Sequence, residues 1–476
     1  MRVVLFGLGN YYCLYKSCFK AVEVIALADN DTNKVGTTID GFNVIAPAEV
    51  IDLVFDYIFL LGAPQNIFDM KKQIVSLGMS EEKIADIYDI RRLCQPPKDF
   101  SCVQLFTDRF DRYNDYSENK KTIAIVHPTR GQILNGADTC LLQLCAVLIK
   151  SYDVHVILAR DSTLRERVQE CGVDVIIDKY SHIKKWSDIY WRDMYDLLIV
   201  NTIDRFNILN QPLEEISLPV VWWLHSVEKT IDAVPLVRLK DMPHDNINVY
   251  SVSPLSRDNF KKSLPHWSVQ QLLYGVENNT RSCRAERSSG RVIFALVGRW
   301  CSGKGHDVLL DAISKLPDVI RGKCEFWFAG YFNKNDSFVQ KQMDKIKKIS
   351  NIKVLGMLNK EQLAEVYEQI SVLVCPSRAD AMPIVCAEAM MYHHPCIVSE
   401  NVGTKIFIDD KKSGLICKTG DAVDLCSKIQ WCVMNQDKLL EMGDRAYNIY
   451  LNNFTMKKFE TNVLKIIEDK VNCDFR

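Results

Sequence analysis

Short apolar runs followed by helical patterns recur along the whole chain, and this alternation constrains the fold more than any other feature. The runs Val3 to Phe6, Thr122 to Val126 and Val292 to Val297 have the length of buried strands. Each is followed by a segment whose apolar residues repeat at helical spacing. Such units build parallel sheets covered by helices. We therefore expect an α/β fold from one end to the other.

Length and two polar stretches predict three domains. The 476 residues exceed the roughly 100 to 200 residues of a typical single domain. A charged stretch at 95–121 contains Pro96-Pro97, and an Arg- and Ser-rich stretch occupies 281–291. Both are typical of connectors between folded blocks. We place the domains at 1–117, 118–285 and 286–476.

The composition excludes several classes of protein. The apolar fraction of 47 % and the charged fraction of 25 % are ordinary for a globular chain, and the net charge of −1 provides no basic field for nucleic acid. The 17 cysteines form no CxxC pair or zinc-type cluster, which indicates reduced thiols in the cytosol. Neither a signal peptide nor an apolar run of about 18 residues is visible. We expect a cytoplasmic protein, whose membrane contact, where it occurs, is peripheral at the inner face.

A glycine turn near the N-terminus is typical of nucleotide-binding domains. Gly7 and Gly9 follow the first strand, and Asp29 ends the next one, at the spacing of a ribose contact. Tyr12 occupies the position of the third glycine, so an accessory nucleotide site and a Rossmann-like domain with an empty crevice both stay open. The run Asp29-Asn30-Asp31 also fits a metal-binding DxD pattern, but a strand end explains it more simply.

Two positions mark ligand-binding edges in the second block. Gly136 opens an amphipathic helix, where a glycine permits close approach and the first amides can meet a phosphate. A plain turn with an N-cap explains Gly136 equally well. His225 ends the apolar run PVVWWL, at the edge where parallel sheets bind ligands. A structural role for this lone histidine is the alternative.

The loop VGRWCSGKGHD of the third block is suited to a diphosphate. Arg299 offers a planar fork of donors and Lys304 a mobile ammonium, while neighbouring glycines let the backbone come close. The stretch Gly298 to Lys304 also satisfies the GxxxxGK pattern of P-loop enzymes. However, Gly305 follows the lysine and has no side-chain oxygen to hold magnesium. A solvated surface loop is the remaining alternative.

The run PSRADAMPIVCAEAM places two carboxylates at the start of a helix. Pro383 suits a first helical turn, Asp380 lies just before it, and Glu388 follows on the helix face that Ile384 shares. Backbone amides at this helix start can face a sugar hydroxyl or a phosphate. They belong to Ala381, Met382 and Ile384.

Residues from about 120 to 460 resemble the retaining GT-B glycosyltransferases usually called family 4, or glycosyl transferases group 1. The segments that carry the resemblance stand in the family's order. They are NGAD, WLHS, SVSPLSRDNF, LLYGVENN, VGRWCSGKGHDVLLDAI, VLGMLNKEQLAEVYEQISVLVCPSR and the acidic pair with its EAM helix. The resemblance implies a GT-B fold, in which two Rossmann-like domains face a cleft. Residues 118–285 would form the acceptor-side domain and 286–476 the donor domain, whose last helix would pack back on the first.

The resemblance also implies roles for named residues. Arg299 and Lys304 would hold the diphosphate, and Glu388 the ribose. Asp380, which replaces the family's usual glutamate, would contact the sugar, and His225 would lie beside it. The implied catalytic residues are therefore His225, Asp380 and Glu388. The implied donor-binding residues are Gly136, Arg299, Lys304, Gly356, Met357, Asp380, Ala381, Met382, Pro383, Ile384 and Glu388, with Gly356 and Met357 flanking the base.

The same resemblance implies transfer from a nucleotide-diphosphate sugar to a glycan or lipid-linked glycan, with retention and without an obligatory metal or cofactor. The first 95 or so residues, with FGLGN, ALADND and IDGFNVIAPAEV, are similar to a small Rossmann-like module of bacterial surface-polysaccharide enzymes. This similarity implies a role in polysaccharide assembly. A P-loop hydrolase or kinase, a GT-B sugar-nucleotide epimerase and a non-catalytic nucleotide-binding scaffold are the alternatives.

Overall fold

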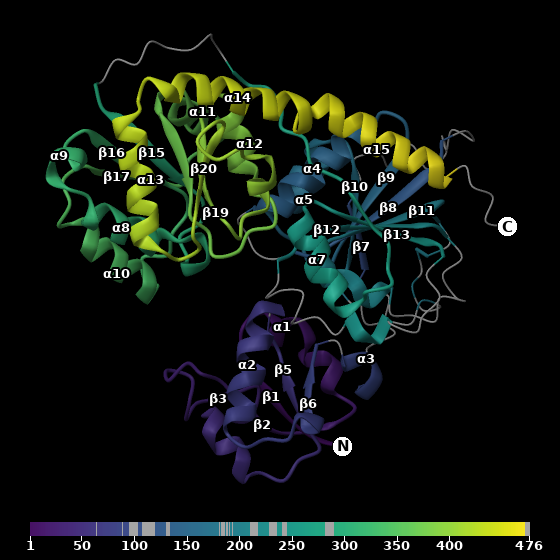
Figure 1. The fold of residues 1–476 in the computed structure, drawn as a ribbon. Helices are drawn as coiled ribbons and strands as arrows, with labels where there is room; N and C mark the ends of the chain where they lie inside the picture. The colour runs from purple at the N-terminus through teal and green to yellow at the C-terminus, as the bar shows by residue number, and fades with distance from the viewer. Residues whose placement is uncertain are drawn as a thin grey trace. The chain divides into compact units, whose positions relative to one another are not determined.

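The described part of the chain is an α/β structure with three sheets (Figure 1). The computed structural model describes residues 1–62, 64–87, 89–94, 103–106, 120–129, 134–179, 181, 186, 189, 191–192, 194–209, 218–227, 236–239, 245–280 and 290–471. Most of the two expected connectors, together with the boundaries placed at 117 and 285, lie outside these residues.

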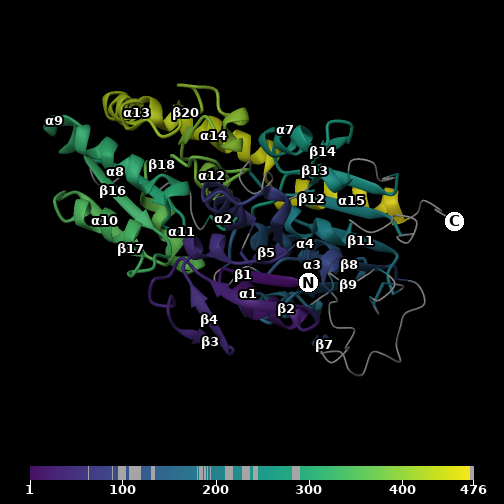
Figure 2. The ribbon, with the colours of Figure 1, turned by 90° about the horizontal axis from the view of Figure 1, so that it is seen from below.

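The first sheet belongs to the N-terminal Rossmann-like domain and has the strand order β3-β4-β2-β1-β5-β6. Its strands are parallel except for the β3–β4 hairpin, which Figure 2 shows at one edge. The strands are β1 Arg2–Phe6, β2 Glu23–Ala28, β3 Thr38–Ile39, β4 Phe42–Ile45, β5 Tyr57–Leu60 and β6 Ile84–Asp86. The α-helices between them are α1 Asn10–Tyr15, α2 Pro64–Ser76 and α3 Ile90–Leu93.

The second sheet has the order β14-β13-β12-β11-β8-β9-β10-β7. The neighbouring strands β12, β11, β8, β9 and β10 pair in parallel. Strand β7 lies at the edge and pairs antiparallel with β10. The strands are β7 Val103–Phe106, β8 Thr122–His127, β9 Asp153–Leu158, β10 Asp174–Asp178, β11 Leu197–Asn201, β12 Val220–Leu224, β13 Ile247–Ser251 and β14 Val269–Gln271. The α-helices of this region are α4 Gly136–Leu148, α5 Thr163–Glu170 and α7 Pro254–Ser263.

Strand β7 lies inside the stretch that the sequence presents as a connector, so that interpretation is wrong for Val103–Phe106. Its four residues, VQLF, pair with β10 at the edge of the sheet. The central strands β11 and β12 are buried along their whole length. Continuous apolar runs of this kind are expected where helices cover both faces of a parallel sheet.

The third sheet is parallel throughout, with the order β17-β16-β15-β18-β19-β20. Helices α8 and α13 pack together beside it, and α12 packs on α14 (Figure 1). The strands are β15 Val292–Val297, β16 Cys324–Ala329, β17 Ile352–Gly356, β18 Val372–Cys375, β19 Cys396–Ser399 and β20 Gly414–Cys417. The helices are α8 His306–Lys315, α9 Asp318–Arg321, α10 Ser337–Ile346, α11 Lys360–Gln369, α12 Ile384–Met391, α13 Ala422–Met434, α14 Lys438–Asn453 and α15 Met456–Val471.

The described residues fall into two compact units. The first contains Met1–Tyr250, Asn259–Val269 and the chain from Ile467 onward, and the second contains Ser251–Asp258 and Gln270–Ile466. Among the described helices, none combines the length and the apolar character that crossing a bilayer demands. The predicted α/β class is confirmed, and the apolar runs at Thr122, Val220 and Val292 form the strands β8, β12 and β15.

Candidate functional site

Two residues from separate loops of the second unit form an ion pair at the carboxyl ends of its central strands. Lys304 follows β15 in a short 3-10 turn, Ser302–Lys304, and Asp380 follows β18. The Lys304 Nζ lies 2.5 Å from Asp380 Oδ2, and the two side chains are 36 % and 15 % exposed. Burial opposes the charge, but the Asp380 carboxylate raises the pKa of Lys304 above its usual value. Adjacent central strands thus bring together Lys304, which is predicted to bind the diphosphate, and Asp380, which is predicted to contact the sugar.

The Lys304 loop is fastened to the loop that follows β18. Gly305 has a φ of +73°, and a Cβ atom built there would lie 2.2 Å from the Pro376 carbonyl oxygen. The Arg378 amide donates to the Gly303 carbonyl at 2.8 Å. The Arg378 guanidinium donates to both carboxylate oxygens of Asp307, at 2.9 and 2.7 Å. These contacts fix the turn that carries Lys304.

The Asp380 loop is held by a similar close approach. The Asp380 amide donates to the Asn401 carbonyl at 3.1 Å, and the Gly403 amide donates to the Asp380 carbonyl at 2.9 Å. A Cβ atom at Gly403 would lie 1.7 Å from the Ala381 carbonyl oxygen, so only glycine fits. The next helix, α12, starts after Pro383 as its N-cap. Amides in the first turn of a helix lack intrahelical acceptors, which suits them to an anion.

Glu388 lies on α12 and is held by a tyrosine from α11. The Tyr367 hydroxyl donates to Glu388 Oε2 at 2.7 Å. Loss of hydration raises the pKa of Glu388, although the Tyr367 hydrogen bond and Lys360 act in the opposite direction. The Tyr274 hydroxyl donates to the Pro383 carbonyl at 3.0 Å at the other end of this segment. Two tyrosines therefore hold the helix that carries the second predicted carboxylate.

Three other residues predicted for donor binding in this unit have no described contact with the Lys304–Asp380 pair. Arg299 is exposed after β15, and the structure describes no ion pair for it. Gly356 ends β17 with a φ of +71°, and its carbonyl accepts from the Gly330 amide at 2.7 Å. Met357 follows with 65 % of its surface exposed. No described contact joins Arg299, Gly356 or Met357 to the Lys304–Asp380 pair, and their ligand roles stay predictions.

In the first unit, His225 is the outer member of a polar network at the ends of three adjacent strands. His225 Nε2 lies 2.8 Å from Asn201 Oδ1. The Asn201 amide nitrogen lies 2.9 Å from His127 Nδ1, and His127 Nε2 lies 2.8 Å from Asp138 Oδ1. His127, Asn201 and Asp138 are 1 %, 0 % and 4 % exposed, whereas His225 is only partly buried. The network therefore runs from the interior outward to His225.

Gly136 is the first residue of α4 and is preceded by a side-chain cap. The Asn135 Oδ1 accepts hydrogen bonds from the amides of Ala137 and Asp138, at 2.8 and 3.3 Å. The Asp138 carboxylate in turn accepts from the Asn135 amide at 2.8 Å, which completes a capping box. This geometry supports the N-cap interpretation of the segment. The phosphate contact at Gly136 stays a prediction.

In the N-terminal domain, Asp29 binds the glycine turn that follows β1 and two residues just after itself. Asp29 accepts from the Leu8 amide at 2.7 Å and from the Asp31 amide at 2.9 Å, and it pairs with Lys34 at 3.1 Å. Although burial alone would raise it, these donors lower the pKa of Asp29. Gly7 has a φ of +98° in the turn that Asp29 supports. Asp29 thus stabilises the glycine turn itself, and its ribose contact stays a prediction.

Gly9 is the N-cap of α1, and two side chains of the segment that follows it, those of Tyr12 and Lys16, bind Asp40. The buried Tyr12, at the third glycine position, donates its hydroxyl to Asp40 at 2.7 Å, and Lys16 pairs with the same oxygen at 2.8 Å. Burial and the Asp40 carboxylate raise the pKa of Tyr12. The aromatic ring occupies the position at which the nucleotide-binding motif has a small residue. Side-chain packing thus replaces close backbone approach at this point.

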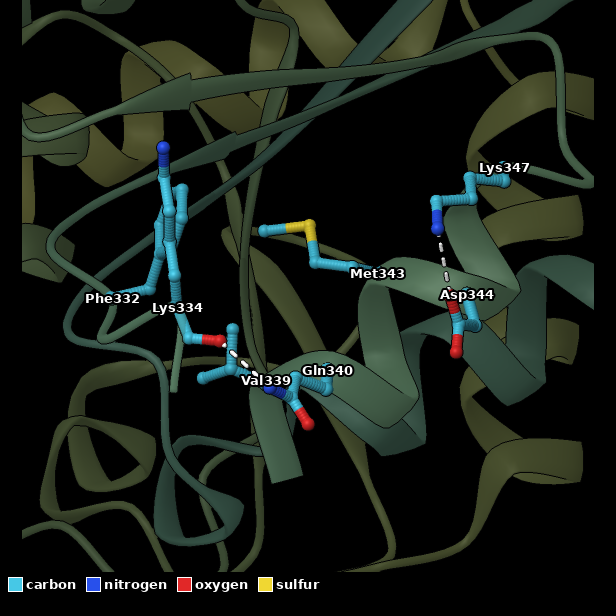
Figure 3. Close-up of a pocket in the computed structure, with 7 residues that line it drawn as sticks. All are labelled: Phe332, Lys334, Val339, Gln340, Met343, Asp344 and Lys347. Carbon is cyan, nitrogen blue, oxygen red and sulfur yellow. Dashed lines mark hydrogen bonds and ion pairs between the residues drawn. The ribbon is translucent and has the colours of Figure 1, made fainter. Parts of the chain in front are cut away.

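A surface hollow of about 320 Å³ lies beside α10, and none of its lining residues is predicted for donor binding. Figure 3 shows two polar contacts among its lining residues. The Gln340 side chain donates to the Lys334 carbonyl at 3.1 Å, and Lys347 pairs with Asp344 at 2.8 Å. The apolar lining residues are Phe332, Val339 and Met343. We assign no function to this hollow.

Several residues of these arrangements were missed at the level of sequence. Tyr367 lies in a helical pattern and Arg378 in a loop, and an ordinary structural role explains each of them. Asn201 ends an apolar run that contains no known motif. The available signal was position, since polar residues at the carboxyl ends of parallel strands gather at one edge. His127 and Asn201 both satisfy that criterion.

Two family models match the chain. Residues 281–449 match glycosyl transferases group 1, and residues 1–85 match the family described as C2185-like, N-terminal. These matches cover the segment with Lys304, Asp380 and Glu388 and the segment with the Gly7 turn.

Curated relatives match over shorter stretches. An uncharacterized glycosyltransferase of Methanocaldococcus jannaschii is 26 % identical over 177 residues, which are 36 % of this chain and 47 % of the relative. The D-inositol 3-phosphate glycosyltransferase of Corynebacterium kroppenstedtii is 25 % identical over 220 residues, which are 44 % and 48 % of the two chains. The chain thus spans about half the length of the curated relatives it matches.

A solved structure extends the likeness over a larger share of the chain. The Anabaena protein Alr3699/HepE in complex with UDP superposes with a TM-score of 0.63 and 14 % identity, covering 73 % of this chain and all of the other. At this identity the superposition shows a common fold. The chain therefore has the GT-B fold, preceded by a further α/β domain, and its residues 281–449 match the model of glycosyl transferases group 1.

Proposed function

We propose that this chain is a retaining glycosyltransferase of family 4 that transfers a sugar from a nucleotide-diphosphate donor to a glycan or lipid-linked glycan. The observation that carries the proposal is the Lys304–Asp380 pair, with an ammonium and a carboxylate 2.5 Å apart in a group 1 segment. Lys304 would bind the diphosphate and assist its departure as negative charge develops. Asp380 would accept hydrogen bonds from the sugar hydroxyls.

Glu388 and the start of α12 complete the donor site in this proposal. A carboxylate on α12 suits the two hydroxyls of a ribose, and Tyr367 already fixes its orientation at 2.7 Å. The amides before α12 can stabilise phosphate or sugar oxygens without a metal ion. A solved protein of the same fold is bound to UDP, which makes uridine nucleotides the first donors to test. His225 would lie beside the reacting sugar.

The geometry at Gly305 argues against a P-loop enzyme. Such an enzyme needs a serine or threonine oxygen on magnesium immediately after the lysine. Any Cβ atom at position 305 would lie 2.2 Å from the Pro376 carbonyl, in a left-handed backbone conformation. The tight packing excludes the side chain that this chemistry requires.

The cellular setting is also part of the proposal. We place the enzyme in the cytoplasm, in surface-polysaccharide assembly, with any membrane contact peripheral. The 14 cysteines in the described part of the chain are all free thiols, which agrees with a reducing compartment. The match of residues 1–85 to the C2185-like, N-terminal family supports a dedicated accessory module.

A thermal-shift screen with UDP-, GDP- and ADP-sugars tests the proposal. A donor at a hundred times its dissociation constant stabilises the folded protein by about 2.7 kcal/mol. We expect such a shift with one nucleotide class and its loss in Lys304→Ala. Product analysis by NMR then shows whether the anomeric configuration is retained. If no nucleotide sugar stabilises the full chain, the proposed function is wrong.

A further inference from the structure

The polar network that ends at His225 has a defined direction of hydrogen bonding. Asp138 Oδ2 accepts from the Asn135 amide at 2.8 Å, and its other oxygen faces His127 Nε2, also at 2.8 Å. Asp138 lies in the first turn of α4, where the partial positive charge of the helix terminus stabilises a carboxylate. Asp138 therefore does not need a cationic histidine to balance its charge. The simplest assignment places a proton on His127 Nε2.

That proton determines the remaining protons of the network. His127 is 1 % exposed, and burial favours the neutral ring, which has one N–H and one lone pair. With the proton on Nε2, His127 Nδ1 must accept, and the group that faces it at 2.9 Å is the Asn201 amide nitrogen. The Asn201 oxygen is then directed toward His225 Nε2 at 2.8 Å. An amide oxygen only accepts, so His225 must donate from Nε2.

We infer that Asn201, His127 and Asp138 are positioning residues that fix His225 as its Nε2-protonated tautomer. The strand order β12-β11-β8 places His225, Asn201 and His127 at neighbouring strand ends, so the topology of the sheet brings the three side chains together. His225 then enters its chemistry as a neutral ring whose Nδ1 is a hydrogen-bond acceptor. Within the proposed function, such a ring suits a sugar hydroxyl better than a phosphate.

The opposite arrangement of protons in the network predicts a different tautomer of His225, which can be measured. If His127 carried two protons, the Asn201 amide would be reversed and its NH₂ group would face His225. His225 Nε2 would then accept, and the proton of the neutral ring would lie on Nδ1. The two arrangements differ in which ring nitrogen of His225 carries hydrogen, so one measurement on the unmodified protein distinguishes them.

Nitrogen-15 NMR of the full-length protein, labelled at its histidine rings, tests the inference without any substrate. The His225 signals are assigned by their absence in His225→Gln. We expect a protonated-type Nε2 and an unprotonated-type Nδ1 for His225, together with a protonated Nε2 for His127. A His225 ring that is protonated on Nδ1 overturns the inference. Because no donor is added, this result is independent of whether glycosyl transfer is found.

Two variants separate positioning from simple packing. Asn201→Leu keeps a similar volume but removes both hydrogen bonds, so the His225 signals should move toward the average of two exchanging tautomers. Asn201→Asp retains only acceptors and should leave His225 Nε2 protonated while His127 gains a second proton. His155→Gln is the matched control, because His155 is buried on the neighbouring strand β9 and contacts Tyr195. Unchanged His225 signals in a folded Asn201→Leu protein overturn the inference, and the unmodified protein decides it if that variant does not fold.

Discussion

The Tyr367 hydroxyl donates a hydrogen bond to Glu388 at 2.7 Å and so stabilises the ionised carboxylate against the effect of burial. Tyr367→Phe removes this donor without changing the ring. Because burial already raises the pKa of Glu388, the variant should raise it further. In the proposed donor site the ribose would be bound by the ionised form of Glu388. Donor affinity should therefore be lost as pH falls, and at a higher pH in the variant than in the unmodified protein.

Donor dissociation constants measured across pH for both proteins check this prediction. Tyr392→Phe is the matched control, since Tyr392 stacks on Tyr367 but directs its hydroxyl toward the Asn279 carbonyl. The same pH dependence in all three proteins would contradict the role of Tyr367.

Lys304→Ala should weaken donor binding by about 10- to 100-fold, the range expected for loss of a hydrogen bond to a charged group. The variant also leaves Asp380 without its ammonium partner, so a modest fall in melting temperature should accompany the loss. Lys315→Ala, on the exposed face of α8, is the control and should bind donor normally. Equal affinities of the two variants, measured by calorimetry, would exclude Lys304 from the donor site.

Gly305→Ala should destabilise the second unit far more than Gly420→Ala. Both glycines have left-handed backbones, with φ of +73° and +75°. A left-handed alanine costs about 1 kcal/mol at either position. Only at Gly305 does the new Cβ meet another atom, the Pro376 carbonyl oxygen at 2.2 Å, whereas the space around Gly420 is open. Urea unfolding of the two variants compares their free energies of unfolding. Equal losses of stability would show that the loop around Pro376 moves to accommodate the new Cβ atom.

Asp29→Asn should destabilise the protein at neutral pH and have a smaller effect in acid. The pKa of Asp29 is lowered in the folded state, so its stabilisation is present above the unfolded value of about 3.9. It is lost as pH falls through the lower folded value. Melting temperatures of the variant and the unmodified protein should therefore converge below about pH 4. Asp52→Asn, at an exposed position, should show no such convergence.

If the proposed donor site is right, turnover should survive EDTA, because Lys304, Arg299 and the α12 amides would supply the positive charge that a metal would otherwise provide. The measurement is sugar transfer or donor hydrolysis before and after chelation. Complete loss that manganese restores would instead direct attention to Asp29 and Asp31.

The sequence predicts the strands and single residues better than the contacts between them. The runs that form β8, β12 and β15 are mainly apolar, rich in Val and Ile and only five or six residues long, which is typical of buried strands, and Pro383 marks the start of α12. Lys304 and Asp380 are each visible in a motif. Their pairing depends on β15 and β18 being neighbours in the sheet. The local sequence pattern does not predict this strand order.

The same reason explains what sequence analysis missed. His127 and Asn201 are 74 positions apart and contact each other only because β8 and β11 are adjacent. Tyr367 has the spacing of an ordinary core residue of α11, and nothing local shows that its hydroxyl reaches Glu388. Strand β7 was taken for a connector because only four residues pair at a sheet edge.

The fastening of the Lys304 turn by Pro376 and Arg378 has a consequence for how a ligand arrives. A turn that is already shaped loses little conformational entropy when it closes on a diphosphate. Donor capture should then be limited by diffusion and orientation, with no slow rearrangement of the turn before the complex forms. Loosening the Arg378–Asp307 pair would in that case reduce the rate of capture, although neither residue is among those proposed to bind the donor.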